Sequence, residues 1–160
     1  MFTDISLPLG LGLRKIQPQD LAFTETLFAS TREYLLQIPL PRAQIEFLIK
    51  QQFLMQQASY STSFPLAETF IIEFDSSPVG KVIVNNTSDS LHVIDIALMN
   101  NMRGKNVGST VLRALKQVAA QELRPLRLVV DQQNSRAKKL YLRLGFTLSE
   151  SSATHDTLLW

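Results

Sequence analysis

The chain has 160 residues, of which 45% are hydrophobic and 19% charged, so it is long enough to bury the core of one globular domain. Sixteen Lys and Arg against fourteen Asp and Glu give a net charge of +2, too small and too evenly spread to indicate a nucleic-acid partner. The lack of cysteine excludes disulfides and a thiol nucleophile, and leaves no cysteine ligands for zinc. We expect one domain over 1–160, without a bound metal.

The N-terminal sequence MFTDISLPLG contains an acid and a proline instead of the basic and apolar segments of a signal peptide. No apolar run in the chain approaches the roughly eighteen residues that are needed to cross a bilayer. The expectation is therefore a cytoplasmic protein with no membrane partner.

The first third of the chain is predicted to be helical after one strand. Residues 12–16 have the composition of a strand, and the QPQD segment that follows supplies a proline and an acid of the kind found at helix starts. Apolar residues at helical spacing extend this helix to about residue 35, where IPLPR breaks it. A second helix is predicted over 43–58, with a broad apolar face that includes Ile45, Leu48, Ile49, Phe53 and Met55.

Short segments rich in β-branched and aromatic residues begin at residue 69. TFIIEF and KVIVNN flank residues 75–80, a turn sequence rich in Asp, Ser, Pro and Gly, and together they predict a β-hairpin. A further turn leads to LHVIDIALM, which is the longest strand candidate in the chain. A helix from Val107 to about Leu123, the strand LRLVVD, the helix SRAKKLYLRLG and strands near FTLS and DTLLW complete a mixed α/β order, β-α-α-β-β-β-α-β-α-β-β.

The segment MNNMRGKNVGS joins the long strand to the following helix and could bind an anion. Main-chain N–H groups and the positive end of a helix dipole converge at such a junction, which suits a phosphate. Arg103 and Lys105 add positive charge, and Gly104 and Gly108 allow a close approach of the backbone. The alternative is a plain helix start with two solvated basic side chains.

Two known phosphate loops do not fit this segment. A nucleoside-triphosphate loop ends in Gly-Lys-Ser/Thr, whereas here Ser109 follows Gly108 directly. A dinucleotide turn requires Gly-x-Gly-x-x-Gly after the first strand of a βαβ unit, and neither this spacing nor the preceding hairpin agrees with it.

The turn instead resembles the pyrophosphate turn of the GCN5-related N-acetyltransferase (GNAT) family, whose pattern is Gln/Arg-x-x-Gly-x-Gly/Ala. Here it reads Arg103-x-x-Asn106-x-Gly108. Asparagine replaces the first family glycine, but asparagine is the residue other than glycine that best tolerates a left-handed backbone. The segment NSRAKKLYLRLGF resembles the second family signature, with its Asn, Ala, Tyr and Gly-Phe at the corresponding positions. The two motifs together cover residues 91–148.

The resemblance implies a GNAT-like α/β (α+β) fold, with a central, mostly antiparallel mixed sheet flanked by helices. It implies acetyl-CoA as co-substrate and direct transfer of the acetyl group to a primary amine, either of a small molecule or of a protein. A homodimer is also considered. The second function class is a non-catalytic module on the same fold that binds or senses acyl-CoA.

The resemblance also assigns the residues that contact the co-substrate. Main-chain groups of Ala97, Leu98 and Met99 are expected to bind the pantetheine arm. The turn and the second motif are expected to contribute Arg103, Gly104, Lys105, Asn106, Val107, Gly108, Ser109, Asn134, Ala137, Lys138 and Tyr141.

Two residues are predicted to be catalytic. Tyr141 matches the family tyrosine that protonates the leaving thiolate; the alternative is an ordinary aromatic residue on a buried helix face. Asp95 is an acid inside an apolar strand, where burial tends to raise a carboxyl pKa, so it is a candidate base. The alternative is a structural carboxylate paired with a buried polar group, or one on a solvated face of the sheet. Glu73 is a weaker candidate base, and His92 and His155 are given no role.

The acceptor amine is expected to bind between the first two helices and the final strands, as in the family. The aromatic residues of these parts are Tyr34, Phe53, Tyr60 and Trp160, which could equally belong to the core or the rim. Nothing in their spacing indicates a particular acceptor.

Overall fold

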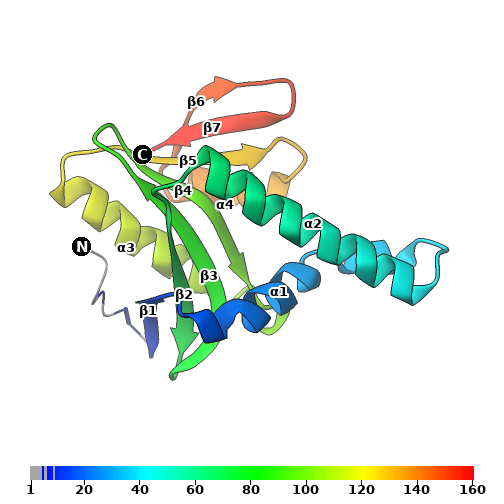
Figure 1. The fold of residues 1–160 in the computed structure, drawn as a ribbon. Coiled ribbons are helices and arrows are strands. Elements are labelled where there is room, and N and C mark those ends of the chain that lie inside the picture. Colours follow the sequence, from blue (N-terminus) through cyan, green and yellow to red (C-terminus); the bar gives the residue numbers. More distant parts are fainter. Residues whose placement is uncertain (1–4, 6, 9) are drawn as a thin grey trace.

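The structure is a computed structural model that describes residues 5, 7–8 and 10–160. Its helices and strands follow the predicted order (Figure 1). They are β1 (Leu11–Lys15), α1 (Leu21–Ser30), α2 (Arg42–Ser63), β2 (Glu68–Phe74), β3 (Ser77–Asn86), β4 (Leu91–Leu98), α3 (Val107–Gln121), β5 (Leu126–Asp131), α4 (Ser135–Arg143), β6 (Thr147–Ser151) and β7 (His155–Leu159). The short 3-10 helices are η1 (Pro18–Asp20), η2 (Glu33–Gln37) and η3 (Asn100–Met102).

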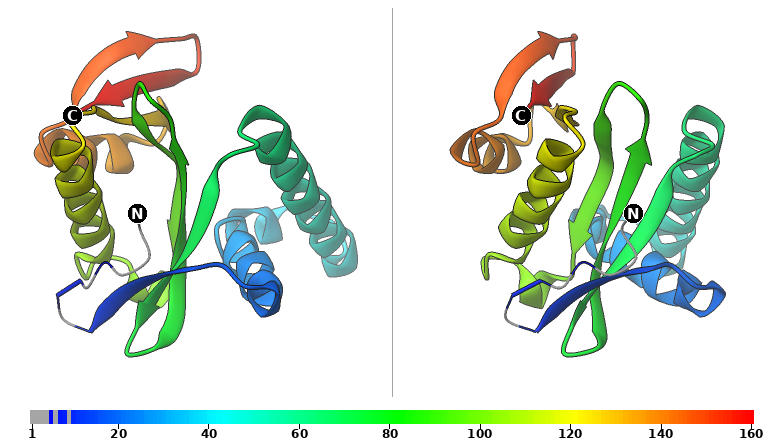
Figure 2. Two further views of the ribbon diagram at one scale, coloured as in Figure 1. Left: turned by 60° about the vertical axis from the view of Figure 1, so that its left-hand side comes forward. Right: turned by 90° about the vertical axis from the view of Figure 1, so that its left-hand side faces the viewer.

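The described strands form one mixed sheet in the order β1-β2-β3-β4-β5-β7-β6. Every neighbouring pair is antiparallel except β4 and β5, which are parallel and are joined by α3. Helices α1 and α2 lie on one face of the sheet, and α3 and α4 lie on the other (Figure 2). The predicted mixed sheet flanked by helices is therefore confirmed.

Helix α3 is held against the sheet by one apolar stripe. Val107, Val111 and Leu115 follow one another at intervals of four residues, which places them on the same face, and all three are buried. They pack in the main core with strand residues such as Val84 and Leu91. Because this stripe starts at the first residue of α3, packing fixes the position of the turn that precedes the helix.

The first two helices differ from their prediction. Helix α1 ends at Ser30, and residues 33–37 form η2 instead of continuing it. Helix α2 extends to Ser63, and its predicted apolar face is only partly buried, since Met55 is 69% exposed while Ile45 and Phe53 are enclosed. Leu48, which is 44% exposed, lies in the N-terminal half of α2, and this half projects past the edge of the sheet (Figure 1).

The β2–β3 hairpin is tighter than predicted. Asp75 and Ser76 form its turn alone, with φ of 46° and 65°. Two consecutive left-handed residues match the twist of the flanking strands, so pairing resumes at once and β3 begins at Ser77. Gly80 lies within β3, where a Cβ would stand 2.5 Å from the carbonyl oxygen of Ala97 on β4. This glycine therefore allows β3 and β4 to approach closely.

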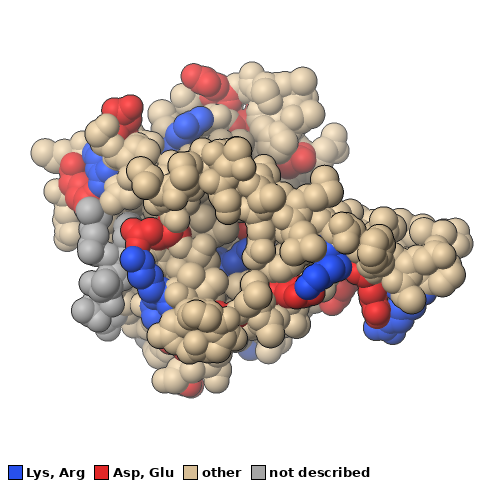
Figure 3. Space-filling model, in the orientation of Figure 1, with Lys and Arg blue, Asp and Glu red and all other residues tan. Residues whose placement is uncertain are grey.

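Figure 3 shows acidic and basic side chains mixed over one face of the molecule, with no large area of a single charge. This agrees with the small net charge of +2. Among the described residues, none of the helices has the combination of length and hydropathy that spanning a membrane requires.

Candidate active site

The site begins where the two parallel strands of the sheet separate. β4 and β5 pair over only three positions, from Leu91 opposite Leu126 to Val93 opposite Leu128. Beyond Val93, β4 stays paired with β3 as far as Leu98, while β5 is paired with β7. The sheet is consequently open between the second half of β4 and β5.

A β-bulge in β4 decides which side chains face this opening. Asp95 pairs with Ile83 and Val93 pairs with Val84, so Ile94 is an extra residue in β4. Without it, strict alternation would place Asp95 on the same face as Val93, in the core under α3. With it, Ile96 and Leu98 pack toward that core, and Asp95 is switched to the face covered by α1 and α2.

The ladder between β3 and β4 also determines which main-chain groups face the gap. The N–H of Met99 donates to the carbonyl of Val79 at 2.9 Å. Hydrogen bonding alternates along an antiparallel pair, so the N–H and C=O groups of Leu98 and Ile96 point away from β3, into the opening. Of the predicted Ala97, Leu98 and Met99, only Leu98 presents its main chain there. Ile96 was not predicted, because the phase of the alternation depends on the pairing.

The predicted anion-binding turn has a left-handed backbone at two positions. Asn106, directly before α3, has φ of 61° and ψ of 16°, and Gly104 has φ of 74°. The expectation of a positive φ at Asn106 is therefore met. The first N–H groups of α3, at Val107 and Gly108, have no partner inside the helix, as at any helix start. The Nε of Arg103 donates to the carbonyl of Leu98 at 3.3 Å, which holds this cation beside the end of β4.

A pocket of about 350 Å³ passes through the opening between the strands. Residues of α1 and α2 form one side of the pocket, and residues from the first half of α3 and from α4 form the other side. Its lining includes Arg32, Gln56, Lys81, Asp95, Ile96, Ala97, Leu98, Arg103, Gly108 and Tyr141. Six of the residues that the sequence predicted to be functional therefore share one pocket: Asp95, Ala97, Leu98, Arg103, Gly108 and Tyr141.

Tyr141 reaches the pocket from α4. Its ring packs at 61° to the ring of Phe146, with the centroids 6.0 Å apart. Burial raises the pKa of the Tyr141 hydroxyl, and the nearby charge of Asp95 raises it further. The hydroxyl of Tyr141 therefore keeps its proton at neutral pH.

Asp95 reaches the same pocket from β4. Its Oδ2 lies 3.7 Å from Nζ of Lys81, which projects from the neighbouring strand β3. Burial raises the pKa of the Asp95 carboxyl, while the charges of Lys81 and Arg32 oppose this rise. Lys81 and Arg32 were not singled out in the sequence. The signal available for Lys81 was a lone cation at the start of the apolar segment KVIVNN.

A second pocket, of about 430 Å³, adjoins the first under the C-terminal half of α2. The two pockets share Gln56 and Lys81. Tyr60 lines the second pocket, and burial, with a smaller contribution from Asp95, raises the pKa of its hydroxyl to about 12.

Three of the four aromatic residues expected around the acceptor lie elsewhere. Phe53 is buried against Phe28, with ring centroids 5.5 Å apart. Tyr34 is exposed on η2, and Trp160 lies beside Gly145 with the Lys116 ammonium 4.4 Å above its ring. Only Tyr60 lines a pocket. Trp160 lies away from both pockets because the final strand pairs on the far side of β5.

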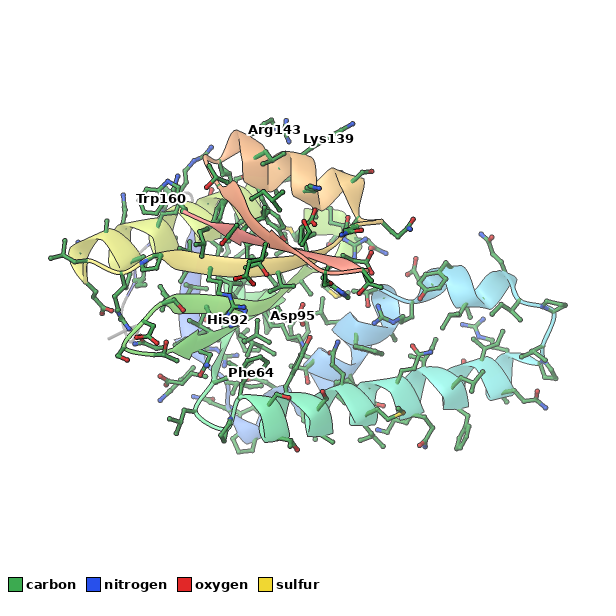
Figure 4. All side chains as sticks on the ribbon, turned by 90° about the horizontal axis from the view of Figure 1, so that it is seen from above. Phe64, His92, Asp95, Lys139, Arg143 and Trp160 are labelled. Carbon is green, nitrogen blue, oxygen red and sulfur yellow. The ribbon has the colours of Figure 1, made fainter. Side chains whose placement is uncertain are left out.

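The remaining acids and histidines lie outside both pockets. Glu73 pairs with Arg14, with 3.1 Å between Oε2 and Nε, so it is not placed to act as the base. The rings of His92 and Phe64 pack edge to face with their centroids 5.5 Å apart (Figure 4). Burial lowers the pKa of His92 to about 4. His155 is exposed, 4.0 Å from Asp131.

Asn134, Ala137 and Lys138 of the second motif make contacts within the fold. The side chain of Asn134 accepts a hydrogen bond from the Ala137 N–H at 3.2 Å and caps α4. Lys138 is paired with Asp156 on β7. Lys139 and Arg143 are carried by α4 on the side away from Asp95 (Figure 4). None of these residues lines the pocket between the strands, nor do the predicted Met99, Gly104, Lys105, Asn106, Val107 and Ser109.

Three solved structures with a similar fold are named acetyltransferases. The PaiA N-acetyltransferase from Thermoplasma acidophilum, in complex with coenzyme A, is 18% identical with a TM-score of 0.68, over 93% of this chain and 97% of that one. RimL, a ribosomal L7/L12 α-N-protein acetyltransferase, is 16% identical with a TM-score of 0.70, over 100% and 94%. The ribosomal-protein-S5-alanine acetyltransferase from Vibrio fischeri is 17% identical with a TM-score of 0.64, over 99% and 96%.

The sheet that opens between its two parallel strands thus defines an acetyltransferase fold. The chain belongs to the acetyltransferase (GNAT) family, whose sequence profile matches residues 32–146. This confirms the resemblance inferred from the two motifs, whose residues 103–108 and 134–146 lie in the matched region. No curated protein sequence is significantly similar to the chain.

Proposed function

We propose that this protein transfers an acetyl group from acetyl-CoA directly to a primary amine. The observation that carries the proposal is that a candidate base, Asp95, and a candidate acid, Tyr141, come from different elements and line the same pocket. That pocket lies between main-chain groups of β4 and the N-terminus of α3, which together suit a long polar molecule that ends in phosphates.

Acetyl-CoA fits the opening as follows. The N-terminus of α3 and the side chain of Arg103 would bind the pyrophosphate, because both present positive charge or N–H donors at the surface. The pantetheine amides would pair with Leu98 and Ile96, whose main-chain groups face the gap. The thioester would then lie deep in the pocket, near Tyr141. Gly104, Lys105, Asn106, Val107 and Ser109 shape or surround the phosphate end in this arrangement.

The reaction needs one proton acceptor and one proton donor. The ionised carboxylate of Asp95 takes a proton from the acceptor ammonium, and the free amine attacks the carbonyl carbon of the thioester. The bond between carbon and sulfur breaks, and the hydroxyl of Tyr141 protonates the departing thiolate. The nitrogen then loses its second proton, which restores the hydroxyl of Tyr141, and Asp95 releases its proton to solvent. The products are an N-acetyl amine, CoA and one proton. The raised pKa makes Asp95 a stronger base, and Tyr141, whose pKa is also raised, is protonated at neutral pH and has a proton to donate.

Two measurements test the proposal. CoA at a hundredfold excess over its dissociation constant should stabilise the native state by about 2–3 kcal/mol and raise the melting temperature. Release of thiol from acetyl-CoA in the presence of amines should then separate an enzyme from a module that only binds acyl-CoA. A melting curve unmoved by millimolar CoA would remove the basis of the proposal. A shift of the melting temperature by CoA, with no release of thiol from acetyl-CoA in the presence of any amine, would favour the binding module.

A further inference from the structure

Lys81 is a buried cation at the junction of the two pockets. Its side chain is 8% exposed and lines both of them. Among the described residues that line the two pockets, the cationic side chains are Arg32, Lys81 and Arg103, and the anionic one is Asp95. Burying an ammonium group is costly unless an anion accompanies it, so this excess of positive charge favours a negatively charged ligand.

The second pocket also has more positive than negative side chains. Its described lining contains no acidic residue, and Lys81 is its one charged side chain. The remaining polar groups are neutral and belong to Thr24, Gln56, Gln57, Tyr60, Ser61 and Thr69. An acceptor with several ammonium groups would place additional positive charge beside Lys81 with only Asp95 to balance it, and this counts against a polyamine.

Lys81 and Asp95 do not form a tight hydrogen-bonded pair, so each of them can also contact a charged ligand. Lys81 Nζ and Asp95 Oδ2 are 3.7 Å apart, which is longer than a hydrogen bond between charged groups, about 2.7–2.9 Å. An ammonium group on Asp95 and a carboxylate on Lys81 would make the charges alternate around the cluster. The amine and carboxylate of one ligand can occupy both positions only if they are attached to the same or to adjacent carbon atoms.

We propose, on the basis of the proposed function, that the acceptor is an α-amino carboxylate and that Lys81 determines this specificity by binding the carboxylate. Asp95 then receives the ammonium group at the end of the pocket that Tyr141 also lines. The acceptor side chain extends into the second pocket, whose volume of about 430 Å³ and lining, neutral apart from Lys81, favour an uncharged side chain. The reaction is unchanged, and Lys81 neither gains nor loses a proton.

The test compares neutral L-amino acids with their primary carboxamides in the thiol-release assay. The two members of each pair have the same amino group and side chain, but only the acid carries the negative charge of an α-carboxylate. We expect the kcat/KM of the wild-type protein to be roughly 10- to 100-fold higher for the acid, as for one charge-assisted contact. Lys81→Met should bring this ratio close to one, and Lys81→Arg should keep it above one. Lys50→Met, which alters an exposed cation on α2 paired with Glu25, should leave the ratio unchanged.

Other outcomes overturn the inference. It fails if the wild-type protein acetylates the carboxamides, spermidine or a peptide N-terminus as well as it acetylates the acids. It also fails if Lys81→Met lowers the rates with acid and carboxamide equally, because that is the result of a structural role. The ratio of kcat/KM for acid and carboxamide is measured first on the wild-type protein. The inference can therefore be tested even if Lys81→Met does not fold. Absence of thiol release with every amine, together with an unmoved melting curve in CoA, would instead reject the proposed function.

Discussion

Asp95 on β4 and Lys81 on β3 are diagonal neighbours on one face of the sheet, with 3.7 Å between Oδ2 and Nζ, because β4 contains one extra residue, Ile94. The bulge turns the acid out of the α3 core and into the pocket where β4 and β5 separate. β-bulges often re-aim side chains next to active sites. In this chain the bulge allows Asp95, on the mainly apolar strand β4, to line the pocket.

Asp95→Asn tests the base through the dependence of rate on pH. In the wild-type protein, kcat/KM should rise with pH as Asp95 ionises, and burial places this rise above the ordinary aspartate pKa of about 3.9. The amide cannot accept the proton, so the variant should lose the acidic limb and kcat should fall by roughly 10²- to 10⁴-fold. Asp89→Asn, in the exposed β3–β4 loop, is the control. If Asp95→Asn had the same dependence of kcat/KM on pH as the wild-type protein, Asp95 would have only a structural role.

Tyr141→Phe tests the acid. Loss of the hydroxyl should lower kcat by roughly 10²- to 10⁴-fold, because the thiolate then leaves without a proton. The dissociation constant of CoA, measured by calorimetry, should change little, since the ring and its contact with Phe146 remain. Tyr34→Phe removes an exposed hydroxyl outside both pockets and should have no effect. Equal turnover by the two variants would make Tyr141 an ordinary core residue.

Asn106 tests the shape of the phosphate turn. Its φ of 61° costs an asparagine little and a glycine less, so Asn106→Gly should bind CoA at least as tightly as the parent. Asn106→Val should weaken binding and destabilise the fold by about 1–2 kcal/mol, since a β-branched residue resists this conformation. Asn101→Val in η3 is the matched control, because it changes another exposed asparagine that does not have a left-handed backbone.

Arg103→Ala separates charge from shape in the same turn. It should weaken CoA binding through the lost cation and leave the free energy of unfolding nearly unchanged, since the side chain is exposed. Urea denaturation and calorimetry on the variants at Asn106 and Arg103 measure both quantities. Parental CoA affinity in Asn106→Val would mean that the left-handed turn does not hold the phosphates.

Gly80→Ala tests the close approach of β3 to β4. The added Cβ would stand 2.5 Å from the Ala97 carbonyl and 2.7 Å from Leu98, so the strands must move apart. We expect a loss of about 1–3 kcal/mol in the free energy of unfolding, together with weaker CoA binding at the adjoining Leu98. Gly12→Ala on β1, where nothing lies within 4 Å of the new methyl group, should change stability by less than about 1 kcal/mol. Similar denaturation midpoints for the two variants would contradict this account.

Local patterns in the sequence were enough for the order of the elements. Period-two and helical spacings, turn residues and helix starts are properties of neighbouring residues, so the eleven-element order could be predicted without knowing any long-range contact. The same holds for Asn106, since its tolerance of a left-handed backbone is intrinsic to the residue. The two motifs likewise indicated the family that residues 32–146 match.

Pairing between distant segments decided the rest. The separation of β4 from β5 and the bulge at Ile94 arise from partners far along the chain, and no local spacing reveals them. These features place Asp95 with Lys81 and direct Ile96 toward the gap, whereas Trp160 and Glu73 are carried away from the pockets. Sequence alone therefore determined which elements form, because that depends on local backbone and side-chain preferences. Only the tertiary structure decided which side chains meet, because that depends on strand register, where one extra residue reverses the face of every side chain that follows.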